Sequence, residues 1–237
     1  MYTKEEYAKD CQIHNDMRRL VDSDANRLNY HLMAPAGWLN DPNGLVEKNG
    51  INHVYFQYTP FDAGWGIKSW GHYTTKDWLT YKEEEPFVLI LDSIEDTHNL
   101  GAIIRTAEAS GVHGVIIPKR RSAMVNDTVY KTSAGAVEHM KVARVTNIAR
   151  AIEELQEKGL WIYGADMDGK EVYYDANMTG NIGLVIGGED KGISPLIGKK
   201  CDVLVKIPMV GKVSSLNASV SAAILIYEII RQRNKKI

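Results

Sequence analysis

The fold class is indicated most clearly by the stretch "PFVLILDSIEDTHNLGAIIRTAEASGVHGVIIP", residues 86–118. Its first part, "FVLILD", is a continuous apolar run, as in a parallel strand that is buried on both faces. A helical pattern, "NLGAIIRTAEASG", follows with Gly111 as its C-cap, and "VHGVIIP" is a second strand. A strand, a helix and a second strand in this order predict an α/β fold with a parallel sheet.

The same alternation continues to the end of the chain. Strands are predicted over 141–145, 160–166, 182–189 and 202–209, and helices over 147–159 and 215–233. Asn147 is the expected N-cap and Gly159 the expected C-cap of the first of these helices. Residues 87–237 are therefore expected to form an α/β domain with a mostly parallel sheet. The last helix is more apolar than a solvent-exposed helix needs, which fits a dimer face or burial within its own domain.

Composition excludes several classes of protein. The chain has 237 residues, 44% hydrophobic and 24% charged, with a formal net charge of −2, so nucleic-acid binding would need a local basic patch. Its two cysteines are far apart, which predicts no disulfide framework and fits the reducing cytoplasm. No metal-ligand spacing, signal peptide or apolar run of membrane-spanning length is visible, so no metal site and no membrane association are expected.

The first 86 residues have a different character. Four of the five tryptophans precede residue 87, and an acidic run and a proline in "YKEEEPFVLILD" mark a boundary near residue 86. A capping box at Thr3 and Glu6 predicts a helix through about Leu28. Beyond it, "HVYFQYT" alternates like a strand, and "NDPNG" and "EKNG" predict turns. Asp41, on the first predicted turn, suits the nucleophile of a retaining glycosidase, which also needs a second carboxylate.

"YHLMAPAGWLNDPNGL", "HVYFQYTPF" and "WGHYTTKDWLTY" closely resemble the N-terminal end of glycoside hydrolase family 32, the invertases and sucrose-6-phosphate hydrolases. The resemblance implies that Asp41 matches the nucleophile and that Asn40, Gln57 and Trp65 match substrate-contacting positions. The Arg-Asp-Pro and Glu-Cys motifs that carry the family's other two carboxylates are absent from this chain. One propeller blade cannot bury a core alone. Residues 1–86 are thus expected to be a glycosidase-like, propeller-blade-like fragment without hydrolase activity.

Two glycine-bearing loops follow strands of the second segment, "IGGEDKGIS" at 186–194 and "IPMVGKVSSLN" at 207–217. Open α/β sheets bind ligands at the carboxyl ends of their strands, where these loops lie. Neither loop carries the dinucleotide fingerprint or the Walker pattern, so neither NAD nor a nucleoside triphosphate is indicated. The loops alone leave two alternatives open, a generic small-molecule site or plain turn geometry.

Three longer stretches occur in order, "LDSIEDTHNLGAIIRTAEASGVHGVIIPKRRS", "GLVIGGEDKGIS" and "IPMVGKVSSLNASVSAAILIYE". Together they resemble the three motifs of the SpoU, or TrmH-like, RNA ribose 2′-O-methyltransferases of the SPOUT superfamily. The resemblance is strongest to bacterial enzymes that methylate a guanosine ribose in 23S ribosomal RNA. It implies a cytoplasmic homodimer that uses S-adenosylmethionine and has a C-terminal trefoil knot. A sugar hydrolase and a non-catalytic binding protein are the alternatives. Since the family's usual N-terminal RNA-binding domain is replaced by the glycosidase-like segment, a fusion of two coding pieces is expected.

The resemblance also assigns residues. The implied catalytic positions are Arg105, Asn99, Glu189, Ser215 and Asn217. The implied cofactor-binding positions, largely through backbone, are Gly187, Gly188, Ile207, Pro208, Met209 and Leu216. The basic loop residues Lys119, Arg120 and Arg121 are expected to contact RNA phosphates. Arg105 is the family's proposed base, but arginine stays protonated, so it could instead stabilise the developing alkoxide or grip a phosphate.

Overall fold

The computed structural model describes residues 13, 16–18, 20–21, 32–34, 37–48, 50–59, 69–78, 82–83, 85–189 and 192–234. The chain forms two compact units, Met1–Glu84 and Glu85–Ile237, and each is described by itself.

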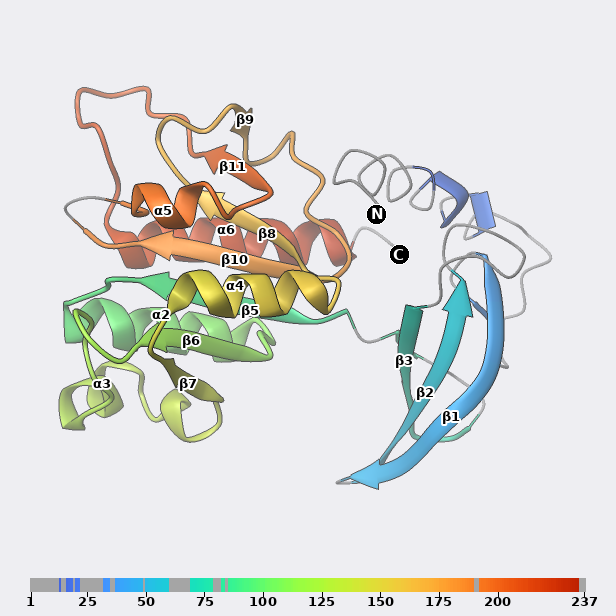
Figure 1. Ribbon diagram of the computed structural model, residues 1–237. Helices are drawn as coiled ribbons and strands as arrows, with labels where there is room; N and C mark the ends of the chain where they lie inside the picture. The colour runs from blue at the N-terminus through green and yellow to red at the C-terminus, as the bar shows by residue number, and fades with distance from the viewer. Residues whose placement is uncertain are drawn as a thin grey trace. The chain divides into compact units, whose positions relative to one another are not determined.

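The second unit is built on a seven-stranded sheet in the order β7-β6-β5-β10-β8-β11-β9 (Figure 1). Its strands are β5 (Phe87–Asp92), β6 (Gly114–Pro118), β7 (Val142–Val145), β8 (Trp161–Ala165), β9 (Glu171–Val172), β10 (Ile182–Gly187) and β11 (Val203–Lys206). Every pairing is parallel. The predicted α/β class with a mostly parallel sheet is therefore confirmed. The trefoil knot stays a prediction.

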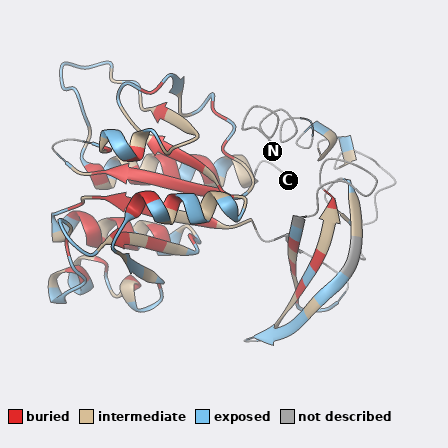
Figure 2. Cartoon of the chain, viewed as in Figure 1, coloured by how far each residue is buried: buried red, intermediate tan, exposed pale blue. Residues whose placement is uncertain are grey.

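Helices cover both faces of this sheet (Figures 1 and 2). The helices of this unit are α2 (Thr97–Ala109), α3 (Asp127–Thr132), α4 (Ile148–Glu157), α5 (Pro195–Gly198) and α6 (Ala218–Asn234), with a 3-10 turn at Ala136–Glu138. Leu89 and Leu91 of β5 pack in one core cluster with α2 and α6, whereas Ile90 packs in a second cluster with α4 and α5. Successive strand residues point to opposite faces, so a strand buried on both sides needs an unbroken apolar run.

Local signals determine where the long helices begin and end. Asn147 caps α4 as predicted, since its side-chain oxygen accepts the Arg150 N–H at 3.1 Å. The C-caps are Ser110 and Lys158, each one residue before the predicted glycine. Gly111 and Gly159 follow with φ of +76° and +84°, where an L side chain would be strained. The short elements α3, α5 and β9 were not predicted, because fewer than two helical turns or three strand residues give little periodicity.

The first unit contains a four-stranded antiparallel sheet in the order β1-β2-β3-β4. The strands are β1 (Trp38–Lys48), β2 (Ile51–Thr59), β3 (Ser69–Thr75) and β4 (Lys82–Glu83). The strand predicted at 53–59 is confirmed within β2. A small core of Val54, Phe56 and Tyr73 lies on one face of the sheet. Most of the predicted helix after Thr3, and Trp65, lie outside the described residues, as do the side chains of Asn40 and Asp41.

The predicted turn at "NDPNG" is wrong. Residues 40–44 continue through β1, whose pairing with β2 shifts register between Leu39 and Pro42 and again between Pro42 and Gly44. Because β1 is an edge strand of its sheet, it can hold a proline and absorb the irregular residues as bulges. Asp41 therefore lies in an irregular strand and not on a tight turn. The second predicted turn is confirmed, since Gly50 joins β1 to β2 with φ of +72°.

Candidate functional site

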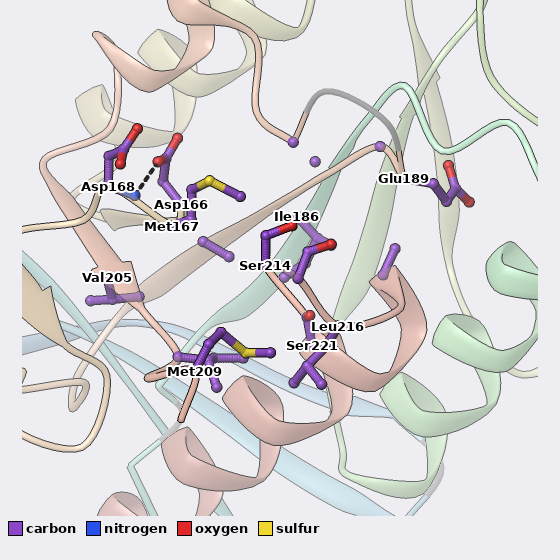
Figure 3. A pocket seen from close by; sticks show the side chains of 17 residues that line it. Asp166, Met167, Asp168, Ile186, Glu189, Val205, Met209, Ser214, Leu216 and Ser221 are labelled. Carbon is purple, nitrogen blue, oxygen red and sulfur yellow. Dashed lines mark hydrogen bonds between the residues drawn. The ribbon is translucent and has the colours of Figure 1, made fainter. Parts of the chain in front are cut away.

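A pocket of about 410 Å³ opens at the carboxyl ends of β8, β10 and β11 (Figure 3). Its lining residues are Ala165, Asp166, Met167, Asp168, Ile186, Gly187, Gly188, Glu189, Gly192, Val205, Ile207, Met209, Ser214, Ser215, Leu216, Ala218 and Ser221. They come from three strand ends and from the start of α6. Parallel strands bring their following loops to one edge of the sheet, so segments distant in sequence meet there.

The first wall of the pocket is a tight glycine loop, residues 187–193, of which 187–189 and 192–193 are described. The Gly192 N–H donates to the Gly188 carbonyl at 3.0 Å, so the loop folds back on itself. A Cβ atom added to Gly187 would lie 2.0 Å from the carbonyl carbon of Gly192. Only glycine lets the two passes of backbone approach this closely. Backbone therefore forms this wall of the pocket.

Glu189, in the glycine loop, connects the pocket to helix α2. The Asn99 side-chain amide donates to Glu189 Oε1 at 2.7 Å, across 90 positions of sequence. Asn99 lies in the first turn of α2 and is only 6% exposed, whereas Glu189 is exposed. The buried amide thus holds the carboxylate in a defined place while the rest of the carboxylate stays accessible.

The second wall comes from the segment before α6. Ser215 and Leu216 line the pocket, and the next residue, Asn217, caps the helix. Its Oδ1 accepts the Ser219 N–H at 2.9 Å and the Ser219 hydroxyl at 2.6 Å. A capping side chain satisfies amide groups that the first helical turn leaves unpaired. The cap determines the direction in which the chain leaves the pocket and enters α6.

The structure brings together most of the residues that the sequence assigned to the site. Those that line the pocket are Gly187, Gly188, Glu189, Ile207, Met209, Ser215 and Leu216. Pro208 and Asn217 stand between lining residues without lining it themselves, and Asn99 reaches it through Glu189. Arg105 is exposed on α2 and is not among the lining residues. The exposed Lys119, Arg120 and Arg121 follow β6 and also lie outside the lining.

Sequence reasoning missed the loop that follows β8. Asp166, Met167 and Asp168 line the pocket, and Asp166 Oδ1 accepts the Asp168 N–H at 2.8 Å. The available signal was an aspartate at the carboxyl end of a predicted strand, the same edge that carries the two glycine loops. With Glu189, these side chains give the described lining three carboxylates and no lysine or arginine. Such a lining favours a ligand that carries positive charge.

No three His, Cys, Asp or Glu side chains among the described residues come together as a possible metal site. No helix within the described ranges is long and apolar enough to span a bilayer.

The second unit is a parallel α/β domain with a pocket at the carboxyl ends of its strands, one wall of which is glycine backbone. Ligand-binding α/β domains carry their sites at this place. The chain belongs to the SpoU rRNA Methylase family, whose model matches residues 86–227. The model of the glycosyl hydrolases family 32 N-terminal domain matches residues 31–103. That second match runs beyond the first unit into β5 and α2, which the structure assigns to the parallel α/β unit.

Relatives and solved structures agree with this assignment. YacO, a TrmH family protein of Bacillus subtilis, is 56% identical over 155 residues, which is 65% of this chain and 61% of YacO. A TrmH family protein of Staphylococcus haemolyticus is 53% identical over 154 residues, 65% of this chain and 62% of its own length. The chain thus spans about three fifths of these relatives.

Two structures illustrate the similarity of fold. The SpoU methyltransferase AviRb from Streptomyces viridochromogenes, in complex with the cofactor AdoMet, has a TM-score of 0.59 and 30% identity, covering 63% of this chain and 58% of AviRb. The A. aeolicus TrmH/SpoU tRNA modifying enzyme has a TM-score of 0.60 and 29% identity, covering 65% of this chain and 78% of that one.

Proposed function

We propose that this protein binds S-adenosylmethionine in the pocket and transfers its methyl group to a ribose 2′-hydroxyl of RNA, with a guanosine of 23S ribosomal RNA as the target. We also propose that it acts in the cytoplasm as a homodimer, and that residues 1–86 and 87–237 are its two domains. One observation carries the proposal. The three segments that resemble the methyltransferase motifs converge on one pocket, through the glycine loop, the segment after β11 and the Asn99–Glu189 hydrogen bond.

The pocket fits the cofactor in size and chemistry. A cavity of about 410 Å³ lies within the usual range for small-molecule sites. Ile186, Val205 and Leu216 offer apolar contacts to a flat base, and the backbone around Gly187 is open to hydrogen bonding. The carboxylates of the lining suit a cofactor that carries a sulfonium and an ammonium group.

The residues of this chain have defined tasks in such a transfer. When bound, S-adenosylmethionine supplies a methyl group on a sulfonium, which is already a good leaving group. A ribose hydroxyl is a poor nucleophile until its proton is removed or shared, so protein groups must align it and assist the loss of the proton. Glu189, held by Asn99, is a carboxylate at the pocket with an accessible oxygen. Arg105 would donate hydrogen bonds to the developing alkoxide or to an adjacent phosphate.

Arg105 supports the homodimer part of the proposal. It is exposed on α2 and does not line the pocket of its own chain. We therefore propose that Arg105 of one copy serves the pocket of the other. Coexpression of an Arg105→Ala chain with a Gly187→Ala chain tests this. Each variant alone should be inactive, and mixed dimers should regain methyl transfer through the one intact pocket. Mixed dimers that stay inactive would contradict the exchange of Arg105.

RNA contacts are proposed for the basic loop after β6. Lys119, Arg120 and Arg121 are exposed, and Arg144 of the neighbouring strand β7 donates to the Lys119 carbonyl at 3.3 Å. Exposed cations of this kind bind the phosphate backbone without reading sequence. Their contribution is therefore to affinity, and the choice of nucleotide falls to other residues.

The deciding experiment is transfer of labelled methyl groups from S-adenosylmethionine to ribosomal and transfer RNA. We expect incorporation into 23S ribosomal RNA, and we expect one phosphodiester to become resistant to alkaline hydrolysis, because a methylated 2′-oxygen cannot attack the neighbouring phosphate. The Arg105→Ala variant serves as the inactive control. Absence of cofactor binding at millimolar concentration by calorimetry would refute the proposal, and label on a base would refute the 2′-hydroxyl assignment.

Sugar hydrolysis is the alternative that the match at 31–103 raises. A retaining glycosidase needs two carboxylates about 5–5.5 Å apart across the scissile bond. This chain retains Asp41 from that family's catalytic set and lacks the motifs that carry the other carboxylates. We therefore do not propose hydrolase activity.

A further inference from the structure

Asp92 is a buried carboxylate whose environment sets it apart from the other acidic residues near the pocket. It is the last residue of β5, at the edge of the sheet where the pocket opens, and it is only 7% exposed. Among the described residues it forms no salt bridge. A carboxylate that is buried without a cation is costly unless hydrogen-bond donors surround it. Its partners should therefore reveal its role.

Asp92 has one hydrogen-bond partner just beyond the glycine loop and one in the residue that follows Asp92 itself. Asp92 Oδ2 accepts the backbone N–H of Ser194 at 2.8 Å, across 102 positions of sequence. Asp92 Oδ1 accepts the Ser93 hydroxyl at 3.3 Å. Ser194 directly follows the glycine loop and is the N-cap of α5. The carboxylate thus tethers the returning end of the loop to the end of β5.

The outgoing end of the loop is held at the same place by backbone contact. Ser93 has φ of +66°, an uncommon conformation for a serine. In this conformation its carbonyl oxygen faces Gly188 so closely that a Cβ added to Gly188 would lie 2.5 Å from it. A Cβ added to Gly187 would lie still closer to backbone, 2.0 Å from the Gly192 carbonyl carbon across the loop. Three backbone segments, at Ser93, at Gly187–Gly188 and at Gly192, therefore pack together with no side chain between them.

We infer that Asp92 is a positioning residue for the methyl-transfer site. By binding the Ser194 N–H it closes the glycine loop, and the closed loop sets both the backbone wall at Gly187 and Gly188 and the place of Glu189. Asn99, on α2, binds the side chain of Glu189. The Glu189 carboxylate is therefore held by its own hydrogen bond to Asn99 and by the closed backbone of the loop that carries it. Asp92 itself does not line the pocket. This inference rests on the proposed function for its catalytic consequence.

Asp202 provides a matched control at the other edge of the same sheet. Asp202 Oδ2 accepts the Ile162 backbone N–H at 2.9 Å near the start of β8, and both of its oxygens accept the Gln156 amide at 2.9 Å. It is a partly buried carboxylate with the same kind of backbone partner, it lies at the amino-terminal ends of the strands, and it is not among the residues that line the pocket. Replacing it removes a comparable structural hydrogen bond without touching the glycine loop.

The test compares Asp92→Ala, Asp92→Asn and Asp202→Ala in the full chain. Loss of a hydrogen bond to a charged group should weaken S-adenosylmethionine binding about tenfold in Asp92→Ala, with a raised KM for the cofactor and a lowered kcat. Asp92→Asn should recover part of this loss, because its amide oxygen can still accept the Ser194 N–H. Asp202→Ala should lower thermal stability and leave cofactor affinity unchanged.

Amide hydrogen exchange on the cofactor-free protein gives a second readout that does not depend on the proposed function. Asp92→Ala should accelerate exchange at Ser194 and in the glycine loop, whereas Asp202→Ala should not. Equal exchange and equal cofactor affinity in the two alanine variants would overturn the role of Asp92. If the unchanged protein fails to bind S-adenosylmethionine, the proposed function falls, and the exchange comparison still decides whether Asp92 closes the loop.

Discussion

Gly187→Ala is the substitution for which the structure gives the sharpest expectation. The new Cβ would lie 2.0 Å from the Gly192 carbonyl carbon, 2.2 Å from the Ile193 nitrogen and 2.3 Å from the Gly192 oxygen. All three neighbours are backbone atoms, so no side chain can rotate away to make room. One methyl group must therefore push the returning pass of the glycine loop out of place.

The size of the effect follows from these distances. Cβ contacts below about 3.0 Å essentially do not occur, so the loop must retreat by about 1 Å. Overpacking of this kind costs about 1–3 kcal/mol of stability. A displacement of about 1 Å in a positioned site can reduce the rate about a hundredfold. We expect Gly187→Ala to fold, with lowered stability, and to lose most of its cofactor affinity and methyl transfer.

Substitutions at two other glycines serve as controls that distinguish a loss of cofactor binding from a general loss of stability. A Cβ on Gly183 would lie 2.5 Å from Ile162 Cδ1, the mobile end of a side chain in the core, so Gly183→Ala should lower stability and preserve cofactor binding. A Cβ on Gly198 in α5 meets nothing within 4 Å, so Gly198→Ala should be neutral or slightly stabilising. Calorimetric titration with S-adenosylmethionine and chemical unfolding measure the two effects. A Gly187→Ala protein that binds the cofactor as tightly as Gly198→Ala does would refute the assigned loop geometry.

Four further expectations follow from the described residues. Asn217→Ala should lower the free energy of unfolding by about 1 kcal/mol in urea titrations, because α6 loses its cap, and Asn217→Asp should restore it. Replacing residues 119–121 with alanine should weaken RNA binding and reduce the slope of log affinity against log salt by about 2–3; an unchanged slope would exclude these phosphate contacts. The hydrogen bond from Tyr130 to Glu138 raises the pKa of Tyr130 above its ordinary 10.0. Its stabilising contribution is therefore present below pH 10.0 and is lost as pH rises through the raised pKa, so Tyr130→Phe should remove a phenol step that lies above pH 10.0 in a spectroscopic titration of the folded protein. The protein should release no glucose or fructose from sucrose or sucrose 6-phosphate, and turnover that Asp41→Asn abolishes would contradict this.

Local signals predicted the elements of the α/β unit well. The apolar runs at 87–92 and 182–187 are strands buried on both faces, and Asn147 caps its helix through the predicted backbone contact. The same reasoning failed at "NDPNG", where proline and glycine predicted a turn. Turn propensity is a local preference, and here the pairing of edge strand β1 with β2 outweighed it. Two register shifts in that pairing accommodate the residues that were expected to turn.

The positions of the site residues show a similar division. Gly187, Gly188 and Leu216 were assigned from motifs and line the pocket. Asp166 was not assigned to the site, because a single aspartate at the end of a strand is common. It indicates a site only when other loops come together beside it. Asn217 was assigned to catalysis from its motif, and the structure adds that it caps α6.

The order along the chain of the longer strands and helices, the glycines that the loops need and the family of the α/β unit could all be recognised from the sequence, because periodicity, caps and backbone freedom depend on a few neighbouring residues. The three-dimensional structure was needed to show that Asn99 holds Glu189 and that Asp92 accepts the Ser194 N–H beside the glycine loop. These partners are separated by 90 and 102 positions. No local pattern specifies such a contact; it exists because β5 and β10 pair in register and bring their carboxyl ends to the same edge of the sheet.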